Sequence, residues 1–263
     1  MKLNIGLAQC RHTPDNDPLS LVRSFAKKAK ASGVDLLVFP ESLMTPYEKE
    51  RCAFLNEAQP ITGSFVSSVN DIAREHSLAL VYTFNEKNPD GNPFNTAVLT
   101  APDGTTLSSY RKVHLFDSEF TQESDRMAAG SKLFEPVWVQ GAIVGIGICY
   151  DLRFPEVARY AALHGAQLML YPAAWVAGER KIEQWQTLLR ARAIENEMYV
   201  AGLSRCDEGY IGHSCIFDPR GDLLASADDS EQLIMATIDS ELIDQTRRAL
   251  PVFDHRRPEL YKD

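Results

Sequence analysis

The chain has 263 residues, of which 44% are hydrophobic and 24% are charged, and its formal net charge at pH 7 is -9. This length and apolar content suffice for a substantial core, so we expect a single domain over residues 1–263. An acidic surface repels phosphate backbones, which argues against a nucleic-acid partner.

The first half of the chain alternates strand-like and helix-like patterns. Short apolar runs predict buried strands, apolar positions at helical spacing predict amphipathic helices, and Gly33 and Pro40 mark two of the ends. In chain order we predict a strand over 3–8, a helix over 19–31, a strand over 34–39, a helix over 65–76, and strands over 78–84 and 96–101.

The second half repeats this logic, and no low-complexity linker divides the two halves. We predict a strand over 142–149, a helix over 154–164, a strand over 168–171, a helix over 179–196, strands over 199–203, 214–217, 223–227 and 233–238, and a helix over 240–250. Strands that alternate with helices in this way predict an α/β protein built in layers.

We do not expect residues 1–10 to form a signal peptide, because their apolar positions alternate with Asn4 and Gln9 and no long apolar run follows. The longest apolar run, at residues 141–150, is shorter than the roughly 20 residues that a membrane-spanning helix needs. We therefore expect no membrane association and a cytoplasmic location.

The five cysteines are odd in number and lack C-x-x-C spacing, so a disulfide framework is not expected. A zinc site at Cys206, His213 and Cys215 is an alternative, but it lacks a fourth ligand and paired spacing. We expect neither a metal nor a cofactor, and activity that survives metal chelation.

Several familiar motifs nearly occur but fail at one position. Residues 145–147 (Gly-Ile-Gly) lack the third glycine of a dinucleotide site, and residues 212–216 (Gly-His-Ser-Cys-Ile) lack the last glycine of a nucleophile elbow. Residues 109–112 match S-x-x-K, but in a strand-like context and without the companion motifs. With no P-loop and no H-E-x-x-H, the common nucleotide, serine-hydrolase and zinc-protease classes are not supported.

Three segments place a reactive group at or just after the end of an apolar strand. They are residues 39–41 (Phe-Pro-Glu), residues 111–117 (Arg-Lys-Val-His-Leu-Phe-Asp) and residues 147–156 (Gly-Ile-Cys-Tyr-Asp-Leu-Arg-Phe-Pro-Glu). Ligand sites of α/β sheets gather outside the carboxyl ends of strands, so an acid, a base and a thiol could converge there. Taken singly, each residue also has an ordinary structural interpretation.

Together these segments resemble the nitrilase superfamily of carbon–nitrogen hydrolases, and the resemblance extends over essentially the whole chain, including residues 191–196 and 250–253. It implies an α-β-β-α sandwich. It also implies a homodimer that stacks two sandwiches, with residues 154–164 and 179–196 at the contact. The tail from about residue 250 to 263 would then reach toward the partner subunit.

The resemblance assigns Cys149 as nucleophile, Glu41 as general base and Lys112 as its cationic neighbour. Lys112 and the backbone N–H of Tyr150 would stabilise the oxyanion. Glu123 matches a second glutamate of the family that orients Lys112 and the substrate.

Two alternatives remain at these positions. Glu123 could instead be a loop carboxylate that pairs with Arg126. His114 could be the base of a Cys–His pair, although Glu41 and Lys112 would then be unexplained.

The residues after Cys149 resemble the subgroup that hydrolyses ω-amides of 2-oxo acids or deaminated glutathione. Such substrates are small amides that bear a carboxylate, which Arg153 could hold in a bidentate manner. Alternatively, Arg153 pairs with Asp151 or Glu156 to shape the loop. Trp175 and Phe116 are predicted pocket walls.

Two other functions remain open. A hydrolase of N-carbamoyl compounds or a general aliphatic amidase would use the same three residues. A binding protein that retained the fold without catalysis is a further alternative, which the presence of Glu41, Lys112 and Cys149 disfavours.

Overall fold

The computed structural model describes residues 1–12, 16–45, 51–119 and 121–261, without the side chains of residues 51–52. Phe120, which belongs to the segment that carries Glu123, and residues 262–263 of the predicted tail lie outside the described residues.

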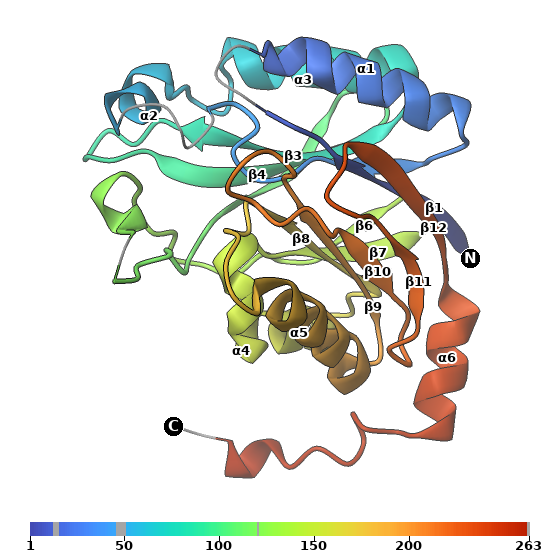
Figure 1. Cartoon of the computed structure of the whole chain (residues 1–263). Coiled ribbons are helices and arrows are strands. Elements are labelled where there is room, and N and C mark those ends of the chain that lie inside the picture. The colour runs from blue at the N-terminus through green and yellow to red at the C-terminus, as the bar shows by residue number, and fades with distance from the viewer. Residues whose placement is uncertain (13–15, 46–50, 120, 262–263) are drawn as a thin grey trace.

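Strands and helices follow one another along the described chain, and most of them lie where the apolar patterns predict (Figure 1). The strands are β1 (Lys2–Gln9), β2 (Leu36–Val38), β3 (Ala79–Glu86), β4 (Phe94–Thr100), β5 (Thr106–Arg111), β6 (Val137–Val139), β7 (Ala142–Ile146), β8 (Leu168–Ala173), β9 (Tyr199–Ser204), β10 (Cys215–Phe217), β11 (Leu223–Ser226) and β12 (Gln232–Asp239). The helices are α1 (Pro18–Ala31), α2 (Arg51–Glu57), α3 (Ser64–His76), α4 (Pro155–Leu163), α5 (Lys181–Asn196) and α6 (Ser240–Ala249), with 3₁₀ turns η1 (Glu123–Asp125), η2 (Cys149–Arg153) and η3 (Pro258–Leu260).

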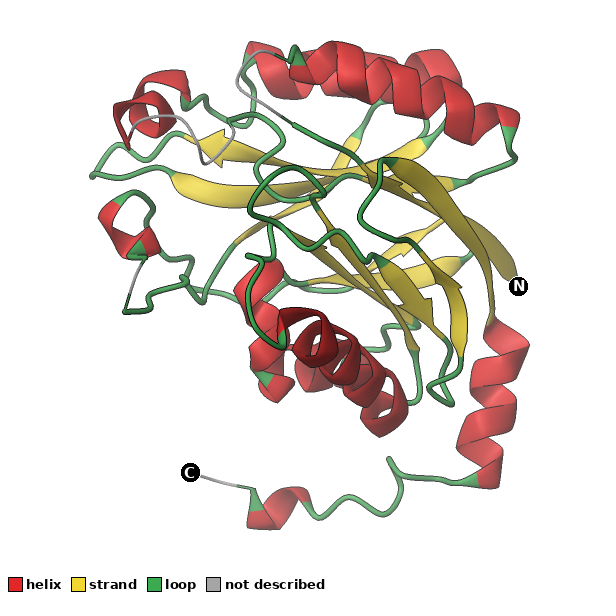
Figure 2. Ribbon diagram, in the orientation of Figure 1, coloured by secondary structure: helices red, strands yellow, loops and turns green. Residues whose placement is uncertain are grey.

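The strands form two six-stranded sheets, in the orders β12-β1-β2-β3-β4-β5 and β11-β10-β9-β8-β7-β6. Figure 2 shows the sheets face to face, with α1 and α3 outside the first sheet and α4 and α5 outside the second. The predicted α-β-β-α sandwich is therefore confirmed. Strands β1, β2 and β3 run parallel to one another, as do β7, β8 and β9, so their carboxyl ends share one edge in each sheet.

Two apolar clusters hold the layers together. One lies between the sheets and under α4 and α5, and includes Leu7, Val38 and Ile146; the other joins α1 and α3 to the first sheet and includes Phe25 and Ile72. Each such side chain contributes about 1.5–3 kcal/mol when it is fully buried. Because β2 and β8 are covered on both faces, they read as continuous apolar runs rather than as alternating ones.

Local signals explain several helix boundaries. The side chain of Asp17 accepts hydrogen bonds from the N–H groups of Leu19 and Ser20, which caps α1 just before its first residue, Pro18. The predicted strand over 142–149 was too long, because β7 ends at Ile146 and Cys149 opens the turn η2. Strand β6 has only three residues, and no apolar run predicted it.

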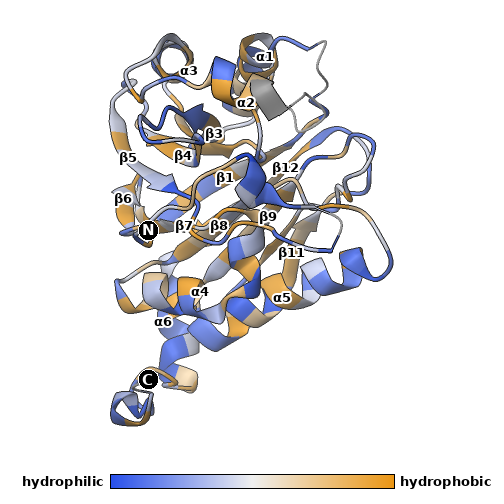
Figure 3. Cartoon of the chain, turned by 90° about the vertical axis from the view of Figure 1, so that its left-hand side faces the viewer, coloured by the Kyte–Doolittle hydropathy of each residue, from blue (hydrophilic) through white to orange (hydrophobic). Residues whose placement is uncertain are grey.

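Helix α6 follows β12, and Figure 1 shows that the segment after it extends below the body of the sandwich. The hydropathy view in Figure 3 shows predominantly polar residues along α6. Leu250, Leu260 and Tyr261 are each more than 60% exposed. None of the helices in the described part of the chain is both long and apolar enough to span a membrane.

Candidate active site

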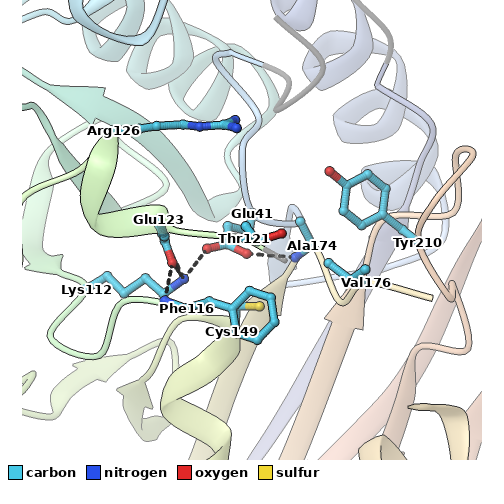
Figure 4. Close-up of a pocket in the computed structure, with 10 residues that line it drawn as sticks. All are labelled: Glu41, Lys112, Phe116, Thr121, Glu123, Arg126, Cys149, Ala174, Val176 and Tyr210. Atoms are coloured by element: carbon cyan, nitrogen blue, oxygen red, sulfur yellow. Dashed lines mark hydrogen bonds and ion pairs between the residues drawn. The ribbon is translucent and has the colours of Figure 1, made fainter. Parts of the chain in front are cut away.

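The three reactive residues predicted from the sequence converge at one edge of the sandwich. Glu41 follows β2, Lys112 directly follows β5, and Cys149 follows β7 from the opposite sheet. All three line a single cavity of about 200 Å³, in which their side chains point toward one another (Figure 4). The fold therefore places an acid, an ammonium and a thiol in one small volume.

The Glu41 carboxyl is held by donors from three parts of the chain. Its Oε1 accepts hydrogen bonds from Asn95 Nδ2 at 2.7 Å and from Lys112 Nζ at 2.9 Å, and its Oε2 accepts from the Ala174 N–H at 2.8 Å. Glu41 is only 1% exposed. A buried carboxyl group needs such partners to offset lost hydration, and these partners also fix its orientation.

Lys112 lies between two buried glutamates. Its Nζ is 2.9 Å from Glu41 Oε1 and 2.8 Å from Glu123 Oε2, and Glu123 Oε2 also accepts the Phe116 N–H at 2.7 Å. Glu123 therefore pairs with Lys112, which is the contact that its expected role of orienting Lys112 requires. Two carboxyl groups hold the ammonium in a fixed position in which it faces the cavity.

Cys149 sits on a turn with unusual backbone geometry. Its φ is 47°, a left-handed conformation that non-glycine residues rarely adopt. Fully buried Asp151 holds this turn: Asp151 Oδ2 accepts the Ile148 N–H at 2.8 Å and the Tyr110 hydroxyl at 2.8 Å. Gly147 precedes it, and a Cβ there would lie 2.8 Å from the Tyr171 ring. As a result, Cys149 lies in a turn after β7, and its thiol faces the cavity.

The pKa of the Cys149 thiol is raised well above its usual value. Burial is the largest cause, and the charge of Glu41 adds to it, while the Lys112 ammonium acts in the opposite direction. A hydrogen bond between the thiol and Glu41 raises the pKa further. The ammonium does not outweigh burial, so the resting group is a thiol and its proton must be removed when it attacks.

His114 contacts residues of the turn that carries Cys149. Its Nδ1 lies 2.8 Å from Asp151 Oδ1, and its ring stacks on Phe154 with the centroids 3.7 Å apart. The ring therefore supports the turn that carries Cys149 by contacting Asp151. This arrangement favours the structural interpretation of His114 over a Cys–His pair.

A recess adjoins the cavity and shares the Cys149 thiol with it. All four residues predicted as oxyanion, pocket or carboxylate contacts line this recess, together with Lys181: Phe116, Tyr150, Arg153 and Trp175. The Arg153 guanidinium carbon is 4.9 Å from the centroid of the Trp175 ring, and its Nη2 donates to Gln184 Oε1 at 2.9 Å. The expected alternative, a pair with Asp151 or Glu156, does not occur.

Several residues of the site were not predicted from the sequence. Asn95 and the Ala174 N–H hold Glu41, and Arg126 and Tyr210 also line the cavity. Asn95 directly precedes the strand predicted over 96–101, and this position at the end of an apolar run was the available signal. Nothing in the local sequence singled out Tyr210.

The alternative zinc site is not formed. Cys206, His213 and Cys215 are all described, and no group of three or more potential ligands that could hold a metal occurs among the described residues. Cys215 is fully buried in β10, as expected for a small core residue.

Residues 4–248 match the family model described as carbon–nitrogen hydrolase. The chain belongs to the carbon–nitrogen hydrolase family. It is 35% identical to the deaminated glutathione amidase of Escherichia coli O157:H7, a match that covers 89% of each chain. It is 34% identical to omega-amidase NIT2 of Homo sapiens, over 94% of this chain and 91% of the other. The protein is thus an enzyme of the amidase type that acts on carbon–nitrogen bonds.

Solved structures agree with this assignment. Nit3 of Saccharomyces cerevisiae, a member of branch 10 of the nitrilase superfamily, superposes with a TM-score of 0.87 at 32% identity, over 97% of both chains. A variant of the amidase from Nesterenkonia sp. AN1 superposes with a TM-score of 0.81 at 27% identity, over 95% of this chain and 98% of the other. That structure shows the result of Michael addition of acrylamide at its active site cysteine.

Proposed function

We propose that this carbon–nitrogen hydrolase cleaves the amide bond of a small carboxylate-bearing amide through a thioester on Cys149. The observation that carries the proposal is the placement of the thiol, the Glu41 carboxyl and the Lys112 ammonium in one buried cavity. An ω-amide of a 2-oxo acid or deaminated glutathione is the substrate class that the names of the relatives support.

Attack begins with proton transfer from Cys149 to Glu41. As the sulfur–carbon bond forms, the carbonyl oxygen becomes negative, and the Lys112 ammonium and the Tyr150 N–H stabilise it. One such donor lowers the barrier by about 3 kcal/mol. Because the thiol pKa is raised, transfer to Glu41 during attack avoids a free thiolate in a dry cavity.

The carbon–nitrogen bond breaks when Glu41 returns the proton to the leaving nitrogen. Ammonia or an amine departs and an acyl thioester stays on Cys149. Glu41 next takes a proton from water, which attacks the thioester, and that proton returns to the departing sulfur. One carboxyl thus acts twice as base and twice as acid, which requires a fixed position beside the sulfur.

Arg153 would hold the substrate carboxylate. Its guanidinium lines the recess next to Cys149, stacks on Trp175 and is oriented by the neutral Gln184 amide. No carboxylate among the described side chains forms an ion pair with Arg153. Its donors can therefore make charge-assisted hydrogen bonds to a substrate.

A panel of amides tests this function by ammonia release, with 2-oxoglutaramate, 2-oxosuccinamate, simple aliphatic amides and N-carbamoyl amino acids compared directly. Deaminated glutathione is followed by release of its amine. We expect the highest kcat/KM with 2-oxoglutaramate, 2-oxosuccinamate or deaminated glutathione. Preference for N-carbamoyl or uncharged amides would replace the proposed substrate class, and turnover of none of them would favour a non-catalytic binding protein.

Three further sequence-based expectations stay predictions: one domain over residues 1–263, a cytoplasmic location and a homodimer. Exposed apolar side chains near the expected contact support the dimer. They include Leu163, which is 46% exposed at the end of α4, and Ile194, which is 49% exposed on α5.

A further inference from the structure

Lys181 lies beside Arg153 in the recess next to Cys149. It is the first residue of α5, half-buried, and its Nζ is 5.7 Å from the centroid of the Phe116 ring, which also lines the recess. Arg153 comes from the turn η2, so two separate elements direct their cations to the same place. Neither composition nor the catalytic segments singled out Lys181.

Neither cation is paired with a carboxylate of the described residues. Arg153 donates to the neutral amide of Gln184, and no described carboxylate lies within ion-pair distance of Arg153 or Lys181. Neighbouring Arg180 differs, because it is paired with Glu183 at 2.9 Å on the exposed side of the helix. The recess therefore holds two positive charges that no carboxylate of the described residues balances.

This arrangement costs stability in the unliganded protein. Burial and the charge of Arg153 both lower the pKa of Lys181. The ammonium also stands at the amino end of a 16-residue helix, where the backbone dipole disfavours a cation and favours an anion. Three independent sources of positive potential thus converge on one small volume.

We propose that Lys181 is a specificity-determining residue that forms, with Arg153, a two-cation subsite for the carboxylate of the substrate. The inference rests on the proposed function and deepens it. The recess is about 20 Å³, which suits a carboxylate group rather than a bulky substituent, and Phe116 and Trp175 provide its apolar walls. A substrate carboxylate would receive charge-assisted hydrogen bonds from both cations while its amide carbonyl lies at Cys149.

The experiment compares two amides that differ in charge but little in shape: succinamate, and isocaproamide, in which an isopropyl group replaces the carboxylate. The readout is the ratio of their kcat/KM values. We expect Lys181→Met to lower this ratio about tenfold, mainly through a higher KM for succinamate, since one charge-assisted contact is lost. Lys181→Arg should largely restore it.

Arg180→Gln is the matched control, because it removes the adjacent cation that does not line the recess, and it should leave the ratio within about twofold of wild type. A ratio unchanged by Lys181→Met, or lowered equally by Arg180→Gln, would overturn the subsite while leaving amide hydrolysis in place. Failure of the wild type to hydrolyse either amide would instead overturn the proposed function, and the subsite with it.

Discussion

Replacement of Cys149 by alanine is expected to reduce kcat about 10⁶-fold, the scale of loss when a covalent nucleophile is removed from a hydrolase. Glu41 and Lys112 cannot compensate, because neither can form the thioester. The residual rate would come only from substrate binding and oxyanion stabilisation. Ammonia release from succinamate, followed at enzyme concentrations high enough to detect slow turnover, measures the effect.

The fold should tolerate this change. Alanine adopts the left-handed backbone of residue 149 no less readily than cysteine, and loss of one sulfur from an 8% exposed site costs about 1 kcal/mol. Cys215→Ala is the control, because it removes a buried sulfur from β10 that lines neither the cavity nor the recess, and it should retain activity. Substantial turnover by Cys149→Ala with an unchanged melting temperature would refute the mechanism.

Lys112→Met is expected to damage both activity and stability. Lys112 is 1% exposed and lies within 3 Å of both Glu41 and Glu123, so its loss leaves two buried carboxyl groups without their shared cation. Breaking a buried charge network in this way costs about 3–5 kcal/mol of folding free energy. Loss of the hydrogen bond that we propose Lys112 makes to the oxyanion would by itself lower kcat by about 10²–10³-fold. Urea unfolding and steady-state kinetics measure the two effects separately.

The double variant Lys112→Met with Glu123→Gln separates these causes. Neutralising Glu123 removes one of the two uncompensated charges, so stability should recover in part. Activity should not recover, because the ammonium that we propose stabilises the oxyanion is still missing. A Lys112→Met protein as stable and as active as wild type would show that the buried network contributes to neither property.

The layered fold could be predicted because burial dictates its pattern. Parallel strands such as β3 and β8 are covered on both faces, so every residue in them is buried and the apolar run is visible in the sequence. The end of β7 before Cys149 could not be predicted from the apolar pattern. Gly147 and Ile148 continue the apolar pattern, while the turn that ends it is imposed by Asp151 through contacts with Tyr110 and His114.

Those site residues that stand at the ends of strands could be predicted from the sequence. Glu41, Lys112 and Cys149 each follow a strand, and the structure brings them together. Their supporting partners come from distant segments: the Ala174 N–H is 133 residues from Glu41 in the chain, and no local pattern encodes that contact. Lys181 likewise could not be recognised as a site residue from the sequence, because only the fold places it beside Arg153.

The proposed mechanism requires a covalent acyl thioester on Cys149, which can be trapped by stopping the wild-type enzyme with acid during turnover of succinamate. Peptide mass spectrometry should find the acyl group on the peptide that contains Cys149, and added hydroxylamine should divert the product to a hydroxamate. Steady turnover with neither the adduct nor the hydroxamate, or with the acyl group on another residue, would contradict the mechanism.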